Sequence, residues 1–248
     1  KMMRKAIVLA RRELGGYFFS PMAYGIGALF LAVSGGFFFF GFPLFNIDPV
    51  FQPGAEASLR QLFMDLAYIM VFIAPLLTMR LMSEEYRSGT IEKLTTAPIS
   101  EAAVIAGKFI GVMVFYAILL SPTLIFLALV GVYGRPDAGV AATGYLGMLL
   151  LGAAFLAVGI FTSTLTHYQI LAAVAAMAIL AFFSLLIQPI VAHAPEPISR
   201  IAARMNIMTY FKDFARGMLD TRGLVYFLGA AAIFLFLSVK ALESRRWR

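Results

Sequence analysis

The stretch "ILAAVAAMAILAFFSLLI", residues 170–187, holds 18 residues and no charged side chain. A helix of about 20 apolar residues crosses the roughly 30 Å of hydrocarbon in a bilayer. A transmembrane β-strand would instead alternate apolar and polar side chains over about ten residues, and this stretch does not alternate. It therefore predicts a membrane-spanning helix.

Five other stretches have the same character. Of the 248 residues, 61% are hydrophobic and only 13% are charged, whereas about a quarter are charged in a soluble domain. The sequence thus predicts an all-α membrane protein, folded as a single domain over residues 1–248, with six transmembrane helices. We expect the six spans at residues 20–42, 62–82, 102–132, 140–165, 168–192 and 222–241.

The charges predict an orientation. Thirteen of the 20 Lys and Arg residues lie in residues 1–12, 80–108 and 240–248, which share one side if six spans are threaded. Positive residues favour the cytoplasmic side, so both termini are expected there. We expect the first span to be retained, because its basic flank is long and no A-x-A cleavage site follows. The chain has no cysteine, which excludes disulfides and thiolate sites.

The segment before the first span mixes apolar and basic residues, which is typical of a helix lying in the headgroup layer. We expect such an N-terminal interfacial helix over residues 1–20, with Ser20 and Pro21 starting the first span. Pro75 and Pro122 are expected to kink the second and third spans. Gly107 and Gly111 form a GxxxG, which favours close helix packing within one subunit, with a dimer seam as the alternative.

Enzyme chemistry has little support. No G-x-x-x-x-G-K-[ST] occurs, so the chain has no phosphate-binding loop of that kind. Only two histidines occur, His167 and His193, at expected helix ends, and they provide no metal cluster. We expect no catalytic, cofactor or metal site. Asp65 and Arg80 are expected near the ends of the second span and no charge inside a span, which disfavours an ion-coupled secondary transporter.

The most polar stretch between two spans is "MRLMSEEYRSGTIEKLTTAPIS", residues 79–100. Ser88-Gly89 is expected to end the helix that leaves the second span, and Pro98 ends a short helix over Thr90–Ala97. Ile91 and Leu94 share a face of that helix. Such a helix suits a groove on a cytoplasmic partner, and a solvated loop is the alternative.

This stretch, with the "GKFIG" of residues 107–111, resembles the same region of the type-2 ABC transporter permeases. Their pattern has an acidic pair, a basic residue, Ser-Gly-Thr, an acidic residue, Leu-x-x-x-Pro-Ile/Val-Ser and Gly-Lys. The tail "YFKDFARGMLDTRGLVYFLGAAAIFLFLSVKALESRRWR", residues 210–248, is similar to the C-terminal end of the branch related to the gliding-motility permeases.

The resemblance implies a permease subunit of an ATP-driven exporter in the bacterial cytoplasmic membrane, paired with a second permease copy over ABC ATPase subunits that bind ATP and Mg. No nucleic acid partner is expected. It also implies a cytoplasmic coupling helix within a coupling region over residues 84–100. The residues assigned to ATPase coupling are Glu84, Glu85, Arg87, Ser88, Gly89, Thr90, Ile91, Glu92 and Leu94.

Two functions stay open at this point. An exporter should line a path between two permease copies with uncharged polar residues of its spans, such as Ser34, Thr123 or Thr162. The alternative is a non-conducting mechanotransmitting or scaffold permease in an envelope machine, whose spans can pack shut. A secondary transporter is less favoured than either.

Residues 188–222 predict an external re-entrant or interfacial hairpin before the last span. The segment has too many charges to cross a membrane and too many aromatic and apolar residues to be a free loop. We expect it to cap the external end of the pathway or to dock an external accessory protein. Its assigned residues are Arg200, Arg204, Phe211, Lys212, Phe214 and Arg216.

Overall fold

The computed structural model describes residues 2–41, 59–89, 99–133 and 137–246, and these contain helices but no strand. Six helical segments are long and apolar enough to cross a membrane, which confirms the predicted all-α fold with six spans. The candidate spans are Pro21–Phe40, Leu59–Arg87, Glu101–Val132, Ala138–Leu165, Gln169–His193 and Thr221–Ser244.

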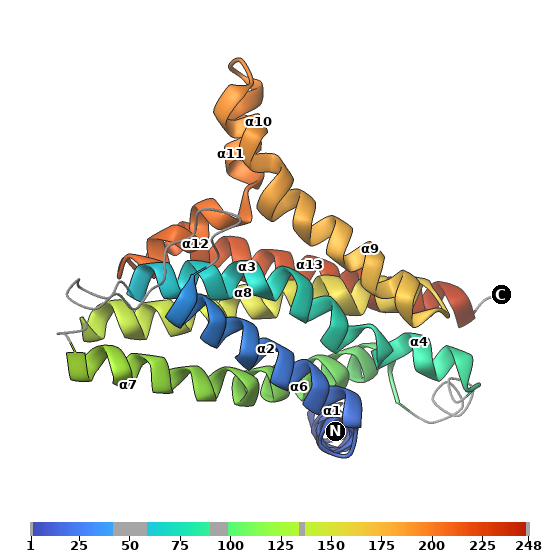
Figure 1. The fold of residues 1–248 in the computed structure, drawn as a ribbon. Helices are drawn as coiled ribbons and strands as arrows, with labels where there is room; N and C mark the ends of the chain where they lie inside the picture. The colour runs from blue at the N-terminus through green and yellow to red at the C-terminus, as the bar shows by residue number, and fades with distance from the viewer. Residues whose placement is uncertain (1, 42–58, 90–98, 134–136, 247–248) are drawn as a thin grey trace.

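Figure 1 shows the arrangement of the helices. In chain order they are α1 (Met2–Phe18), α2 (Pro21–Phe40), α3 (Leu59–Thr78), α4 (Arg80–Arg87), α6 (Glu101–Leu120), η2 (Ser121–Thr123), α7 (Leu124–Tyr133), α8 (Ala138–Leu165), α9 (Gln169–Ala181), η3 (Phe182–Leu186), α10 (Ile187–His193), α11 (Ile198–Met205), α12 (Ile207–Ala215) and α13 (Thr221–Arg246).

Helices α3 and α8 form the centre of the bundle. Most of the residues in the spans that contain them are buried within the chain, whereas a third or fewer are buried in the spans that contain α2, α9 and α13, as in lipid-facing helices. Glycines of α8 allow α3 and α6 to approach this helix closely. A Cβ at Gly152 would collide with the Tyr116 ring of α6, and one at Gly159 would collide with Thr78 of α3. Small residues let helices pack closely where no hydrophobic effect drives association.

Helix α1 precedes the first span and packs along α6. Figure 1 views α1 along its axis while α2, α3, α6 and α8 lie across the page, so α1 runs at a steep angle to them. This is the orientation that an interfacial helix needs. Ser20 is in an extended conformation and Pro21 opens α2, as predicted, although the Ser20 side chain makes no capping bond.

Pro75 and Pro122, the prolines expected to kink the second and third spans, lie next to irregular backbone. Pro122 sits in the 3₁₀ turn η2, between α6 and α7, as its missing N–H predicts. Pro75 lies inside α3, which ends at Thr78, and α4 begins two residues later. The second span is therefore interrupted near Met79, close to the end of the bundle that carries α1, α4 and the end of α13, which we call the α4 end (Figure 1).

The segment predicted as one hairpin over residues 188–222 has two parts. Helices α10 and α11 pack on each other and project away from the bundle, while α12 lies back on α3, α8 and α13 (Figure 1). Phe211 and Phe214 are fully buried. Arg200, Arg204 and Arg216 are exposed, and Lys212 is half-buried.

The apolar side chains of α11 differ from those of α12. Ile201 and Met205 of α11 are exposed, whereas Met208 of α12 is buried. The difference follows from the packing, since α11 contacts mainly α10 and α12 reaches the core.

Candidate coupling site

Helix α4 leads from the second span toward residues 90–98, which lie outside the described residues. Because a helix leaves its first N–H groups without intrahelical acceptors, the break near Met79 needs a partner from elsewhere. Ser163 of α8, fully buried, provides it. Its Oγ accepts from the N–H of Met82 at 3.0 Å and of Ser83 at 3.2 Å, and donates to the Met79 carbonyl at 3.1 Å. One hydroxyl thereby fastens the start of α4 to α8.

Lys108 of α6 connects α4 to α1. Its Nζ donates to Glu85 Oε1 of α4 at 2.8 Å and to Glu13 Oε1 of α1 at 3.0 Å. The lysine is only 1% exposed, and both carboxylates are largely buried. We call Glu13, Glu85 and Lys108 the ion triad. It joins three helices that come from separate parts of the chain.

The approach of α1 to α6 depends on the GxxxG glycines. A Cβ at Gly107 would lie 2.9 Å from the Ala6 carbonyl oxygen, and one at Gly111 would lie 2.9 Å from Glu13 Cβ. These contacts confirm the predicted packing role within one chain for this pair. They also bring Glu13 within bonding distance of Lys108. The ion triad therefore depends on the close packing at these two glycines.

The ion triad corrects the expectation that no charge lies inside a span. Lys108 is buried within the span Glu101–Val132, and Asp65, 3% exposed, lies within the span Leu59–Arg87. Intramembrane charges are costly unless they are paired. Lys108 is paired with Glu13 of α1. The apolar pattern of the spans does not predict where α1 lies, so it could not predict this pair. Asp65 Oδ1 accepts from Gln61 Nε2 at 2.8 Å, and Oδ2 has no hydrogen-bond partner among the described residues.

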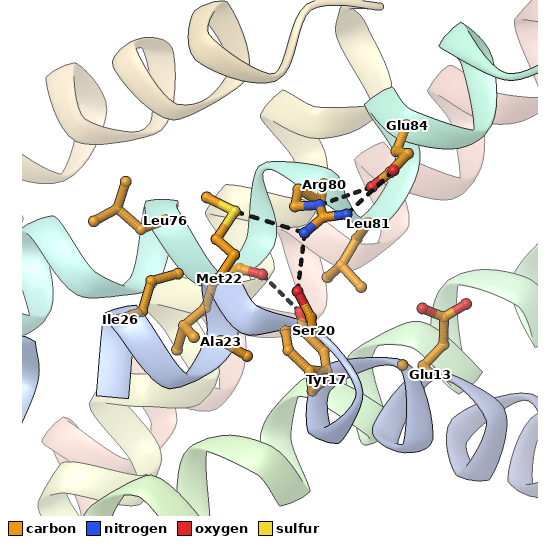
Figure 2. A pocket seen from close by; sticks show the side chains of 12 residues that line it. Glu13, Tyr17, Ser20, Met22, Ala23, Ile26, Leu76, Arg80, Leu81 and Glu84 are labelled. Carbon is orange, nitrogen blue, oxygen red and sulfur yellow. Dashed lines mark hydrogen bonds and ion pairs between the residues drawn. The ribbon is translucent and has the colours of Figure 1, made fainter. Parts of the chain in front are cut away.

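Arg80 pairs with Glu84 within α4 and also bonds to Ser20, in the turn between α1 and α2 (Figure 2). Arg80 Nε donates to Glu84 Oε2 at 2.7 Å, and Arg80 Nη1 donates to Ser20 Oγ at 3.1 Å. Beside it, the Tyr17 hydroxyl donates to the Leu77 carbonyl at 2.6 Å. Burial raises the pKa of the Tyr17 hydroxyl, so this group remains a neutral donor.

The structure separates the predicted coupling residues into three groups. Glu84 and Glu85 point to different partners, Arg80 and Lys108, as adjacent helical residues must. Arg87, Ser88 and Gly89 are exposed at the end of α4. Gly89 has φ of +69°, a left-handed conformation that favours glycine and ends the helix. The other four, Thr90, Ile91, Glu92 and Leu94, lie outside the described residues, as does the whole helix expected over Thr90–Ala97.

Sequence reasoning did not assign Glu13, Lys108 or Ser163 to this site. Lys108 had a signal, because a lysine inside an apolar span predicts a buried counter-ion. Glu13 is an acidic residue in a mainly basic segment, which is a weaker signal. Ser163 had none, since its role depends on where the second span breaks.

These features define a class of protein: a helical, multi-pass membrane subunit whose second span extends into a segment anchored to three other helices. The family model of ABC-2 family transporter proteins matches residues 45–245. The chain belongs to this family, and it is a permease subunit of an ABC transporter. Such subunits are typically non-catalytic and associate with an ABC ATPase and with a second permease. No curated protein matches the chain. The gliding-motility branch stays a prediction.

Proposed function

We propose that this chain is the transmembrane subunit of an ATP-driven exporter, and that the α4 end is cytoplasmic and receives the movement of the ATPase through residues 90–97. The observation that carries the proposal is the anchoring of α4. Ser163 ties its start to α8, and Lys108 ties its second half to α6 and α1. Because both anchoring side chains are buried, a push delivered beyond Gly89 displaces α1, α6 and α8 together and does not bend α4 alone.

The path for substrate is proposed to lie between two permease copies. Ser34, Thr123 and Thr162, expected to line a path, are each buried in the single chain. Each hydroxyl donates to a carbonyl of its own helix or preceding turn. In this closed arrangement they line no open route within the described part of one chain, and a path between two copies would be lined by other residues unless the helices move.

The same closed packing favours a second candidate function, the mechanotransmitting permease through which nothing crosses. In that case the projection formed by α10 and α11 would serve an external accessory protein, because its charged side chains Arg200 and Arg204 are exposed. The two functions differ in whether purified complexes in sealed vesicles move any solute when ATP is supplied.

The coupling step is tested with Leu94→Asp in the complex of this chain with its ATPase. A charge on the face predicted to enter the ATPase groove should cost several kcal/mol if the groove is dry, so the ATPase should no longer co-purify. Thr96→Asp is the matched control, because residue 96 lies on the other side of the expected helix. Normal binding and coupling by Leu94→Asp would contradict the proposed docking role. The isolated chain should show no ATPase activity above background.

A further inference from the structure

A groove of about 170 Å³ opens between α1, α2, α3 and α4, at the α4 end. Figure 2 shows that its lining changes character along its length. Ala23, Ile26 and Leu76 form an apolar end, and Arg80 and Glu84 form a charged end. A groove of this kind fits an amphiphile that places its head group at the charged end and a chain along the apolar end.

At the charged end of the groove, one N–H of the Arg80 guanidinium bonds to a weak acceptor. Its Nη1 donates to Ser20 Oγ at 3.1 Å and to the sulfur of Met22 at 3.6 Å. A thioether is a weak acceptor, whereas a phosphate oxygen accepts a charge-assisted bond from arginine in a matching planar geometry. A phosphate in the groove would therefore gain more from Nη1 than the methionine sulfur does.

The charges of the lining limit which phosphate fits. Glu13 also lines the groove, but its carboxylate is paired with Lys108. Arg80 and Glu84 then balance each other. A ligand with a net charge leaves one of the two uncompensated, whereas a zwitterion can pair its phosphate with Arg80 and a primary ammonium with Glu84. A carboxylate accepts hydrogen bonds from an ammonium, but a quaternary ammonium has no N–H to donate.

The groove is also within reach of lipid. Its walls include α1, which has the orientation of an interfacial helix, and α2, whose Tyr24 and Leu29 are exposed as lipid-facing side chains are. We propose that this groove binds a zwitterionic aminophospholipid of the bilayer, with its phosphate on Arg80, its ammonium on Glu84 and the start of an acyl chain against Ile26 and Leu76. The lipid links α2 to α4 beside the ion triad.

The test measures lipid binding to the full chain, purified with or without its ATPase, in the absence of nucleotide. Native mass spectrometry compares phosphatidylethanolamine, phosphatidylcholine and phosphatidylglycerol with matched acyl chains. The amine lipid should bind best, and Arg80→Gln should weaken its binding about tenfold or more, since hydrogen bonds to charged groups are lost. Ala23→Phe fills the apolar end and should have the same effect without removing a charge.

Arg200→Gln is the matched control. Arg200 pairs with Glu196 at 2.7 Å across four residues, as Arg80 does with Glu84, but it lies away from the groove. It should leave lipid binding unchanged. Equal binding of the three lipids, preference for phosphatidylglycerol, or full binding by both groove variants would overturn the proposal. The readout needs no transport, so it stands or fails separately from the exporter function.

Discussion

Lys108 Nζ lies 2.8 Å from Glu85 Oε1, with the lysine almost fully buried, and so the third span is bonded to the extension of the second. Glu85 belongs to the acidic pair that marks the entry to the expected coupling helix. Its Oε2 is buried and has no hydrogen-bond partner among the described residues. With Glu13 as the second carboxylate, the ion triad carries one formal negative charge in excess, which makes Lys108 the group on which it depends.

Removal of Lys108 should destabilise the chain. Lys108→Met leaves two buried carboxylates without their cation, a change that costs about 3–5 kcal/mol in soluble proteins. The triple variant Lys108→Met, Glu13→Gln, Glu85→Gln should regain most of that stability, because no buried charge remains. Thermal unfolding in detergent measures both. A single variant as stable as the wild type would show that the triad is not a structural unit.

The triple variant also separates stability from coupling. If the ion triad transmits movement, the stable neutral variant should still bind the ATPase. ATP hydrolysis in that complex should then proceed without the transport or partner movement that accompanies it in the wild type. Restored coupling in that variant would assign the triad a purely structural role.

Ser163→Ala should loosen the start of α4. The N–H groups of Met82 and Ser83 lose the Ser163 oxygen as an acceptor in a buried site, at a cost of about 1–3 kcal/mol. Hydrogen exchange measured by mass spectrometry should become faster in peptides that cover these two amides. Ser121→Ala is the control, since the Ser121 hydroxyl is exposed and donates to the Ile118 carbonyl of the preceding helix α6. Equal exchange in both variants would remove Ser163 from the site.

Gly111→Leu should displace α1 from α6. Even a Cβ at this position meets Glu13 at 2.9 Å and the Ala10 carbonyl oxygen at 3.0 Å, so the helices must separate. Gly229→Leu in α13 is the control, because nothing lies within 4 Å of a Cβ there. Spin labels at the exposed Val8 and Ile110 should report a longer distance only in Gly111→Leu. An unchanged distance would contradict the packing of α1 described above.

Phe211 and Phe214 of α12 stabilise the fold, whether or not the segment also has an external role. Both are fully buried, and Phe214 fills the space left by Gly147 of α8 and Gly223 of α13. Replacing both by Ser should lower the unfolding free energy by at least about 3–5 kcal/mol, the usual cost of truncating one buried phenylalanine. Arg204→Glu, on the exposed face of α11, should keep wild-type stability. It is therefore the better variant for testing an external partner, and a loss of stability there would mean that α11 packs on more than α10.

Cysteines at Ser88 and Ser244 should be labelled from the same side of the membrane, since both residues are exposed at the α4 end. A cysteine at the exposed Ala138, at the start of α8, should be labelled from the other side. If the α4 end is cytoplasmic, impermeant reagents added to cells reach only Ala138→Cys. Labelling of all three from one side would contradict six spans.

The sequence by itself determined the membrane spans and several of the points at which helices begin and end. Length and apolar composition decide whether a segment can cross a bilayer, and both are properties of about 20 neighbouring residues. The turn at Ser20 and Pro21 and the end of α4 at Gly89 are equally local, because they follow from the backbone preferences of single residues. These features were therefore predicted without knowledge of any neighbour.

Only the tertiary structure decided what the spans touch. Lys108 pairs with Glu13, 95 residues away, and Ser163 bonds to amides about 80 residues away. Neither pairing leaves a periodic signal, because the partner comes from another helix. For Lys108, close packing at Gly107 and Gly111 sets the position of α1, which carries Glu13. In the same way α11 and α12 both mix apolar and charged residues, yet Phe214 of α12 packs against Gly147 of α8 and Gly223 of α13, while α11 packs mainly on α10. Burial of a charge or a ring is a property of the assembled neighbours, so it could not be read from the segment that carries it.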